Sequence, residues 1–167
     1  MIAIGIDPGK TGYIVRLDTD AHTATTLAIP FRPDEIVCYR TIKRFVDFGA
    51  ADIIVLEKVS CQPKWSAFSG MTFGKITGQL QMLISPYAFR EISSRRWQRD
   101  IHIGFADTMD AKAKSMAAFY RINPGYVSKK KVDHNLVDAF LIADYGLRIN
   151  NQSGKGDWRF DHIQKGA

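Results

Sequence analysis

Ile2-Ala3-Ile4-Gly5-Ile6-Asp7-Pro8-Gly9 is the stretch that decides which fold the sequence predicts. Its first part is a short, isoleucine-rich run typical of a buried strand, and Asp-Pro-Gly is a typical end for such a strand. Alternation along the strand puts Asp7 on the face of Ala3 and Gly5, where small side chains leave room for a ligand. An ionised carboxylate beside apolar neighbours is costly unless it is compensated. The stretch therefore predicts a buried strand that carries an acidic site at its end.

Two other acidic residues stand in apolar surroundings. Glu57 closes the run Ile53-Ile54-Val55-Leu56, and Asp138 interrupts an apolar run over residues 136–143. His134 lies four residues before Asp138, on the same face of a helix. For any one acid alone, a capped or hydrogen-bonded structural carboxylate is an alternative. Together they suggest ligands for a shared cation such as Mg²⁺, which prefers hard oxygen ligands, and they predict a metal-dependent site that acts on phosphate.

The composition is that of a soluble globular protein. The chain has 167 residues, 46% of them hydrophobic and 24% charged, which suits one domain with a substantial core. No apolar stretch approaches the roughly 20 residues that span a membrane, and the N-terminus does not resemble a signal peptide. Cys38 and Cys61 have no paired spacing, so neither a disulfide framework nor a zinc site is expected. We expect a reducing, cytoplasmic setting, which includes an organelle matrix or a phage-infected host cell.

The positive charge is concentrated in one segment. Residues 90–131 contain ten Lys or Arg and four Asp or Glu, so this segment alone accounts for the net charge of +6. Such asymmetry favours a polyanionic partner, because neutralised phosphates release condensed counterions. A solvated basic surface with no partner is the alternative.

The order of expected elements predicts a mixed α/β fold. Strands over residues 2–7, 12–18 and 23–29 form a meander, and a helix over 34–48, a strand over 52–57 and a helix over 66–84 follow. A strand over 87–92 leads into a loop-rich segment over 93–106. A helix capped by Asp107 comes next, and a last helix covers 133–147. We therefore predict a five-stranded mixed sheet flanked by helices in one domain, residues 1–149, with a polar C-terminal tail over 150–167.

Several motifs in this order resemble the RuvC family of Holliday junction resolvases, in the ribonuclease H-like superfamily. The resemblance is carried by Gly5-Ile6-Asp7-Pro8-Gly9-Lys10-Thr11-Gly12, Val55-Leu56-Glu57-Lys58-Val59, Phe73-Gly74-Lys75-Ile76-Thr77-Gly78 and Ile92-Ser93-Ser94-Arg95-Arg96-Trp97. The last motif, Lys130-Lys131-Val132-Asp133-His134-Asn135-Leu136-Val137-Asp138-Ala139, is similar to that of phage and plastid members. The match covers nearly the whole chain up to Gly146.

The resemblance implies a ribonuclease H-like fold and a two-metal hydrolysis of DNA phosphodiesters. Asp7 would bridge two Mg²⁺ ions, for which Mn²⁺ is a possible substitute, while Glu57 and Asp138 each hold one. Where RuvC usually has an aspartate three residues before Asp138, this chain has Asn135. His134 is the expected replacement and Asp133 the expected helix cap, although which of these three residues completes the site stays open. The implied reaction is paired nicking of a four-way junction, and the implied assembly is a homodimer.

Basic and aromatic residues are the expected DNA contacts, for phosphate binding and base stacking. They are Lys64, Lys75, Arg95, Arg96, Trp97, Lys129, Lys130 and Lys131. Trp97 has an alternative role as a core anchor. Residues 65 and 68, both aromatic, would either reach into the junction or pack at the start of the helix. Gly70, Gly74 and Gly78 line one face of that helix, predict close packing against a sheet or a partner helix, and mark it as the first candidate dimer interface.

Three other functions share features with this sequence. The Asp-x-Gly-x-Thr stretch from residue 7 also resembles the phosphate loop of actin-like ATPases, but those need two lobes, and 167 residues supply one. A related nuclease for other branched DNA or RNA–DNA hybrids remains an alternative. So does a non-catalytic junction-binding module, although the three retained acids argue against it.

Overall fold

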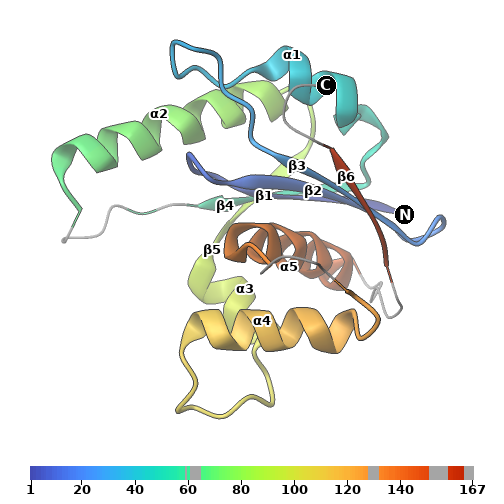
Figure 1. The fold of residues 1–167 in the computed structure, drawn as a ribbon. Coiled ribbons are helices and arrows are strands. Elements are labelled where there is room, and N and C mark those ends of the chain that lie inside the picture. The colour runs from blue at the N-terminus through green and yellow to red at the C-terminus, as the bar shows by residue number, and fades with distance from the viewer. Residues whose placement is uncertain (59, 61–64, 128–131, 151–157, 164–167) are drawn as a thin grey trace.

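The structure is a computed structural model that describes residues 1–58, 60, 65–127, 132–150 and 158–163. Its centre is a six-stranded mixed sheet with the order β5-β4-β1-β2-β3-β6 (Figure 1). The strands are β1 (Ile2–Asp7), β2 (Tyr13–Asp18), β3 (Thr23–Ala28), β4 (Ile53–Lys58), β5 (Phe89–Ser93) and β6 (Arg159–Ile163). The first three form the predicted antiparallel meander, while β4 lies parallel to β1 and β5 lies parallel to β4.

Helices cover both faces of the sheet (Figure 1). On one face lie α1 (Tyr39–Phe45) and α2 (Ala67–Ile84), which pack on alternate strand residues such as Ile4 and Ile6. On the other face lie α5 (His134–Ile149) and, beyond it, α3 (Ser94–Ile101) and α4 (Ala111–Ile122). In the described part of the chain, no helix is both long enough and apolar enough to cross a membrane.

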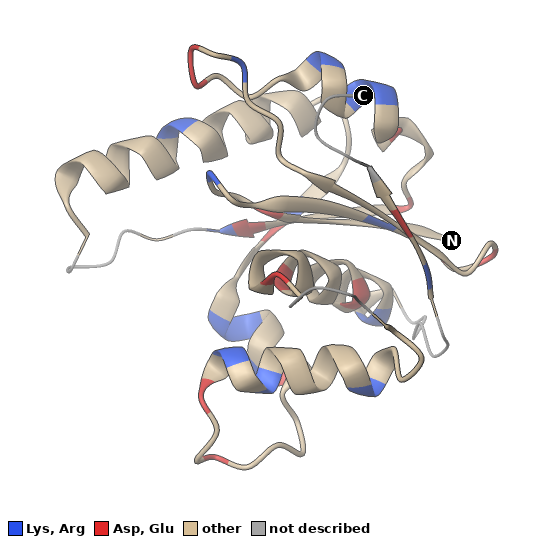
Figure 2. Ribbon diagram, viewed as in Figure 1, with Lys and Arg blue, Asp and Glu red and all other residues tan. Residues whose placement is uncertain are grey.

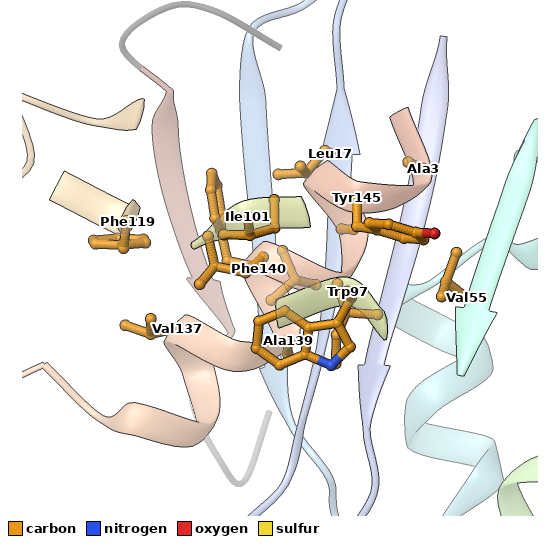
Figure 3. Packing of buried hydrophobic residues seen from close by; sticks show 14 of the residues in the cluster. Ala3, Leu17, Val55, Trp97, Ile101, Phe119, Val137, Ala139, Phe140 and Tyr145 are labelled. Atoms are coloured by element: carbon orange, nitrogen blue, oxygen red, sulfur yellow. The ribbon is translucent and has the colours of Figure 1, made fainter. Parts of the chain in front are cut away.

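Helix α5 packs closely on the sheet because a glycine stands on each side of the contact, Gly5 in β1 and Gly146 in α5. A Cβ added at Gly5 of β1 would collide with the backbone of Ala139 and Ala143, and one added at Gly146 would lie 3.1 Å from Val55 of β4. These small residues let the helix axis approach the strands, so side chains of α5 and of the strand ends meet directly. The fully buried side chains of Trp97 and Phe140 belong to the core around this helix (Figure 3).

The sheet has one strand more than the five that the sequence predicts. Strand β6 pairs in parallel with β3, from Thr23 opposite Arg159 to Leu27 opposite Ile163. These residues fall in the segment that the sequence assigns to a polar tail. The prediction missed them because Trp158-Arg159-Phe160-Asp161-His162 is short and follows a polar, glycine-containing stretch.

Three expected local elements are wrong. The helix predicted over 34–48 is only α1, because residues 31–37 form a tight turn in which Glu35 has a φ of 59° and Phe31 bridges Val37. The segment predicted as loop over 93–106 contains α3, which buries Trp97 and Ile101 one turn apart. The cap of α4 is Asp110, whose side chain accepts from the amide of Ala113, rather than Asp107.

The remaining helix predictions are confirmed. Helix α2 begins after Ser66, whose hydroxyl accepts from the amide of Ser69. Helix α5 begins after Asp133, which accepts from the amide of Asn135 and is therefore the predicted N-cap. The glycine face of α2 differs from expectation: a Cβ at Gly74 or Gly78 would meet nothing within 4 Å, so this face packs on no part of the chain that the structure describes.

Candidate active site

The three predicted acids come together at one end of the sheet. Asp7 ends β1 and Glu57 lies near the end of β4, and the parallel register that pairs Ile6 with Leu56 makes the two carboxylates neighbours. Alternation points both toward the face that α5 covers, because Ala3 and Val55 on the same sides of these strands pack in the α5 core. Asp138 stands in the second turn of α5, directly above this end of the sheet.

These carboxylates lie close enough for their charges to change one another's pKa. Burial raises the pKa of Asp7 well above its usual value, and the charges of Glu57 and Asp138 raise it further. Glu57 in turn has a pKa that burial and the charge of Asp138 raise and that Asp7 lowers. Burial raises the pKa of Glu57 and of Asp138 as well. Without a cation, this group of acids therefore retains protons above the pH at which exposed carboxyls lose them.

Two buried donors contact the outer carboxylates. The indole Nε1 of Trp97 donates to Oε1 of Glu57 at 3.0 Å. Ser115 of α4 lies close enough to Asp138 to oppose the rise that burial causes in the pKa of that carboxyl. The sequence analysis did not identify Ser115. The one feature that could have indicated it is that Ser115 shares the buried face of α4 with Ala118 and Phe119, where a polar hydroxyl is unexpected.

The three candidates for a further ligand occupy different places. His134 lies near enough to Asp138 for its charge to lower the pKa of that carboxyl. Asn135 lines the cleft beside Asp7, and its Nδ2 donates to Oγ1 of Thr11 at 2.8 Å. Asp133 caps α5 and accepts from the hydroxyl of Tyr13 at 3.3 Å. Of the three, His134 has the clearest interaction with an acid of the site.

The donor chemistry fits a hard divalent cation. Buried carboxyl groups whose charges oppose one another gain most from a positive ion between them, because it compensates their charge. Among the described residues, no group of three or more His, Cys, Asp or Glu side chains is arranged closely enough to hold a metal ion. The carboxylates are thus coupled and suitably placed, but they would have to close further around an ion.

A cleft of about 380 Å³ opens beside Asp7. Its walls are the loop over residues 8–12, Asn135 and the first turns of α2. Phe68, whose side chain is 73% exposed, lines it together with Phe73, on which Trp65 stacks at a centroid distance of 5.1 Å. The cleft therefore has a carboxylate at one end and an aromatic wall along α2.

Basic residues cluster on the side of α3 and α4 (Figure 2). Arg95, Arg96 and Arg99 are exposed on α3, and Lys112 near the start of α4 is close enough to Asp138 to lower the pKa of that carboxyl. Lys75 is exposed on α2, on the opposite face of the sheet. The predicted contacts Lys64, Lys129, Lys130 and Lys131 lie outside the described residues.

The prediction that Trp97 contacts DNA is wrong. Its side chain is 0% exposed and belongs to the core cluster beside Ala139 of α5, so no base can stack on it (Figure 3). The alternative role as a core anchor is confirmed. The indole is large enough to fill the space under α5, and it also supplies the donor for Glu57.

Comparison with known proteins identifies the fold. No family model matches the chain, and no curated protein sequence matches it significantly. Thermus thermophilus RuvC matches with a TM-score of 0.61 and 15% identity, over 90% of this chain and 97% of that one. T. thermophilus RuvC in complex with a Holliday junction substrate matches with a TM-score of 0.57 and 12% identity, over 92% of this chain and 99% of that one.

A third solved structure, Fowlpox virus resolvase in complex with its substrate Holliday junction DNA, matches less well. Its TM-score is 0.41 at 16% identity, over 90% of this chain and 97% of that one. The two RuvC structures establish that the chain has the RuvC-like form of the ribonuclease H-like fold, as the sequence predicted.

Proposed function

We propose that this chain is a metal-dependent, structure-selective endonuclease that resolves four-way DNA junctions by paired nicks. The observation that carries the proposal is the coupling of Asp7, Glu57 and Asp138 on one face of a RuvC-like sheet. A structural role would not require three acids with raised pKa to gather beside an open cleft. A phosphodiesterase that uses divalent cations does require it.

Each acid has a distinct role in the proposed reaction. Asp7, whose pKa both other acids raise, would be shared by two cations, while Glu57 and Asp138 would each hold one. When bound, Mg²⁺ or Mn²⁺ would lower the pKa of an attacking water and neutralise charge on the departing 3′ oxygen. His134, beside Asp138, would complete the ligands or orient that water.

The surroundings of the acids suit a DNA strand. The aromatic wall of the cleft, Phe68 and Phe73, offers a surface for an unstacked base next to the scissile phosphate. The arginines of α3 lie on the other side of the acids, where they would hold backbone phosphates of a duplex arm. The continuity of base stacking is interrupted between the arms of a four-way junction, so an aromatic wall beside the acids suits branched DNA better than a continuous duplex.

A homodimer through α2 fits the symmetry of this substrate. Met71, Gly74, Gly78 and Met82 recur at helical spacing, and the two methionines are 75% and 78% exposed. The open space at both glycines would admit a second helix closely. A two-fold dimer would present two sites to two opposed strands. We expect sedimentation to show a dimer that Gly78→Arg converts to a monomer; a wild-type monomer on the junction would contradict the assembly.

The decisive experiment is cleavage of a synthetic mobile four-way junction by wild type and Asp7→Asn. We expect wild type to cut it in Mg²⁺ or Mn²⁺ and to stop when a chelator is added, while Asp7→Asn binds the junction without cutting. Flaps, linear duplex and RNA–DNA hybrid are the comparison substrates. Preferred cutting of one of these would favour a related nuclease. Junction binding by wild type with no cleavage in either metal would favour a non-catalytic binding module.

A further inference from the structure

The buried layer behind the acids contains a second set of polar contacts. We propose that Trp97, His102 and Ser115 are positioning residues that fix the Glu57 and Asp138 carboxylates at the spacing that the cations need. This inference rests on the proposed function. None of the three residues is placed to touch DNA or a reacting atom, so each would act only through the acid that it supports.

Trp97 fixes one of the two carboxylates. Its side chain is completely buried, and its Nε1 donates to Oε1 of Glu57 at 3.0 Å. A ring of this size inside a packed core cannot rotate freely, so the direction of its N–H is set by the core. The bond holds Oε1 in one position and thereby sets the orientation in which the carboxylate presents its remaining lone pairs to a cation.

Ser115 supports the other carboxylate. Its side chain is 2% exposed, its Oγ lies 3.2 Å from Nε2 of His102, and it is near enough to Asp138 to oppose the rise that burial causes in the pKa of that carboxyl. A hydroxyl has one proton, so a Ser115 that donates to ionised Asp138 accepts from His102, which must then carry a proton on Nε2. The proposed order of donation is therefore His102 to Ser115 to Asp138.

One short helix joins the two supports. Trp97 lies in α3 and His102 caps its end, where its amide donates to the carbonyl of Gln98 at 2.8 Å. The rings of Trp97 and His102 meet edge to face, with centroids 6.0 Å apart. Arg121 of α4 donates to the carbonyls of Ile101 and Ile103, which ties the two helices together. Glu57 lies in β4 and Asp138 in α5, but the residues that support them lie in α3 and α4. The distance between the two carboxylates thus depends on how rigidly α3 and α4 are held together.

Simple packing does not account for these donors. Trp158 is also a buried tryptophan of this core, at 7% exposure, yet its Nε1 has no hydrogen-bond partner among the described residues. A tryptophan in this core can therefore be accommodated without such a bond. The N–H of Trp97, in contrast, points at Glu57, and Ser115 lies near enough to Asp138 to lower the pKa of that second acid. Hydrogen bonds of this kind orient metal ligands, and their loss typically lowers metal affinity or activity about 10- to 100-fold.

The test compares Trp97→Phe and Ser115→Ala with Trp158→Phe, a matched control that also removes a buried indole N–H. Calorimetric titration of the DNA-free proteins with Mn²⁺ measures affinity, and circular dichroism checks the fold. We expect Trp97→Phe and Ser115→Ala each to weaken Mn²⁺ binding about 10-fold or more and to raise the Mg²⁺ concentration for half-maximal cleavage similarly, because ligand orientation is lost. Junction affinity without divalent metal should stay unchanged. Trp158→Phe should behave as wild type in both measurements.

A second pair of variants addresses the proton order. His102→Gln retains an N–H donor toward Ser115 and should bind Mn²⁺ more tightly than His102→Leu, which retains none. If Trp97→Phe proves unfolded, Ser115→Ala decides the matter, since it removes a single oxygen and leaves the core otherwise intact. Folded variants with the Mn²⁺ affinity and Mg²⁺ dependence of Trp158→Phe would overturn the inference alone. A wild-type protein that neither binds Mn²⁺ nor cuts any nucleic acid would overturn the proposed function as well.

Discussion

Gly5 of β1 lies directly against the backbone of Ala139 of α5, with no space for even one methyl group between them. This contact brings the carboxylate of Asp138, one residue before Ala139, down to the end of the sheet where β1 ends. The close approach of a helix to a strand is therefore what assembles the site from distant parts of the chain.

Gly5→Ala should destabilise the protein and disturb the site together. The added methyl must displace the α5 backbone, and overpacking of this kind typically costs about 1–3 kcal/mol. For a domain of this size each kcal/mol lowers Tm by about 2–4 °C. Thermal unfolding followed by circular dichroism measures the loss. Gly9→Ala is the control, because its Cβ would approach nothing closer than 3.4 Å. Equal Tm values for the two variants would contradict this explanation of the close packing.

Asp7→Asn should stabilise the metal-free protein at neutral pH. Because burial and its acidic neighbours raise the pKa of Asp7 in the folded state, the folded protein binds protons more tightly than the unfolded chain. The stability of metal-free wild type therefore falls as the pH rises from about 4 toward 8, whereas that of the variant falls less. A tenfold difference in proton affinity between the two states corresponds to about 1.4 kcal/mol of stability.

Thermal unfolding at several pH values in chelator measures this effect. Asp7→Asn should unfold at a higher temperature than wild type at pH 8, and the difference should shrink near pH 4. Mg²⁺ should then raise the Tm of wild type more than that of the variant, because binding to the folded state stabilises it. A variant less stable than metal-free wild type at pH 8 would show that the acids do not repel one another.

His134→Ala and Asn135→Ala should separate the two candidates for the last ligand. His134 interacts with Asp138, whereas the amide of Asn135 is engaged with Thr11. Loss of a general base or ligand typically costs about 10²- to 10⁴-fold, so His134→Ala should slow single-turnover cleavage of the junction at least 100-fold. Asn135→Ala should slow this cleavage less than about 10-fold, because groups that do not bind the metal directly typically change activity by about 10- to 100-fold and Asn135 is engaged with Thr11. A larger loss of cleavage rate in Asn135→Ala than in His134→Ala would identify Asn135 as the last ligand.

Replacement of both Arg95 and Arg96 by alanine should weaken junction binding in a salt-dependent way. If each arginine neutralises one phosphate, the slope of log K against log salt should become less steep by about 1.8, since each contact contributes about 0.9. Arg40→Ala with Lys43→Ala is the matched control, because both residues are exposed on α1 at the other face of the sheet. Filter binding from 50 to 200 mM salt measures the slopes. Equal slopes for the two double variants would exclude α3 as the phosphate-binding surface.

The periodicity of the sequence was sufficient for the central strands and the acids. Alternation placed Asp7 on the correct face, the end of an apolar run marked Glu57, and an acid inside an apolar helix marked Asp138. The local signals failed where tertiary packing decides the structure. Helix α3 has only eight residues and two buried apolar side chains, Trp97 and Ile101, which are too few to show a helical period in the sequence.

The contacts behind the acids could not be predicted for a different reason. Ser115 and His102 are 13 residues apart and belong to neither a motif nor a charge pattern. Their meeting depends on the angle between α3 and α4, which no local sequence feature encodes. Trp97 was noticed because it is aromatic and stands beside two arginines, but the same neighbours suggested a surface role that its burial excludes.

Strand β6 covers the backbone of β3 along residues 23–27. Without it, a row of unpaired amide and carbonyl groups would face solvent at this side of the sheet, and such rows can recruit strands of other molecules. The last described segment of the chain therefore protects the protein from self-association through its sheet. A chain shortened after residue 150 would be expected to precipitate on concentration, even though every proposed metal ligand would still be present.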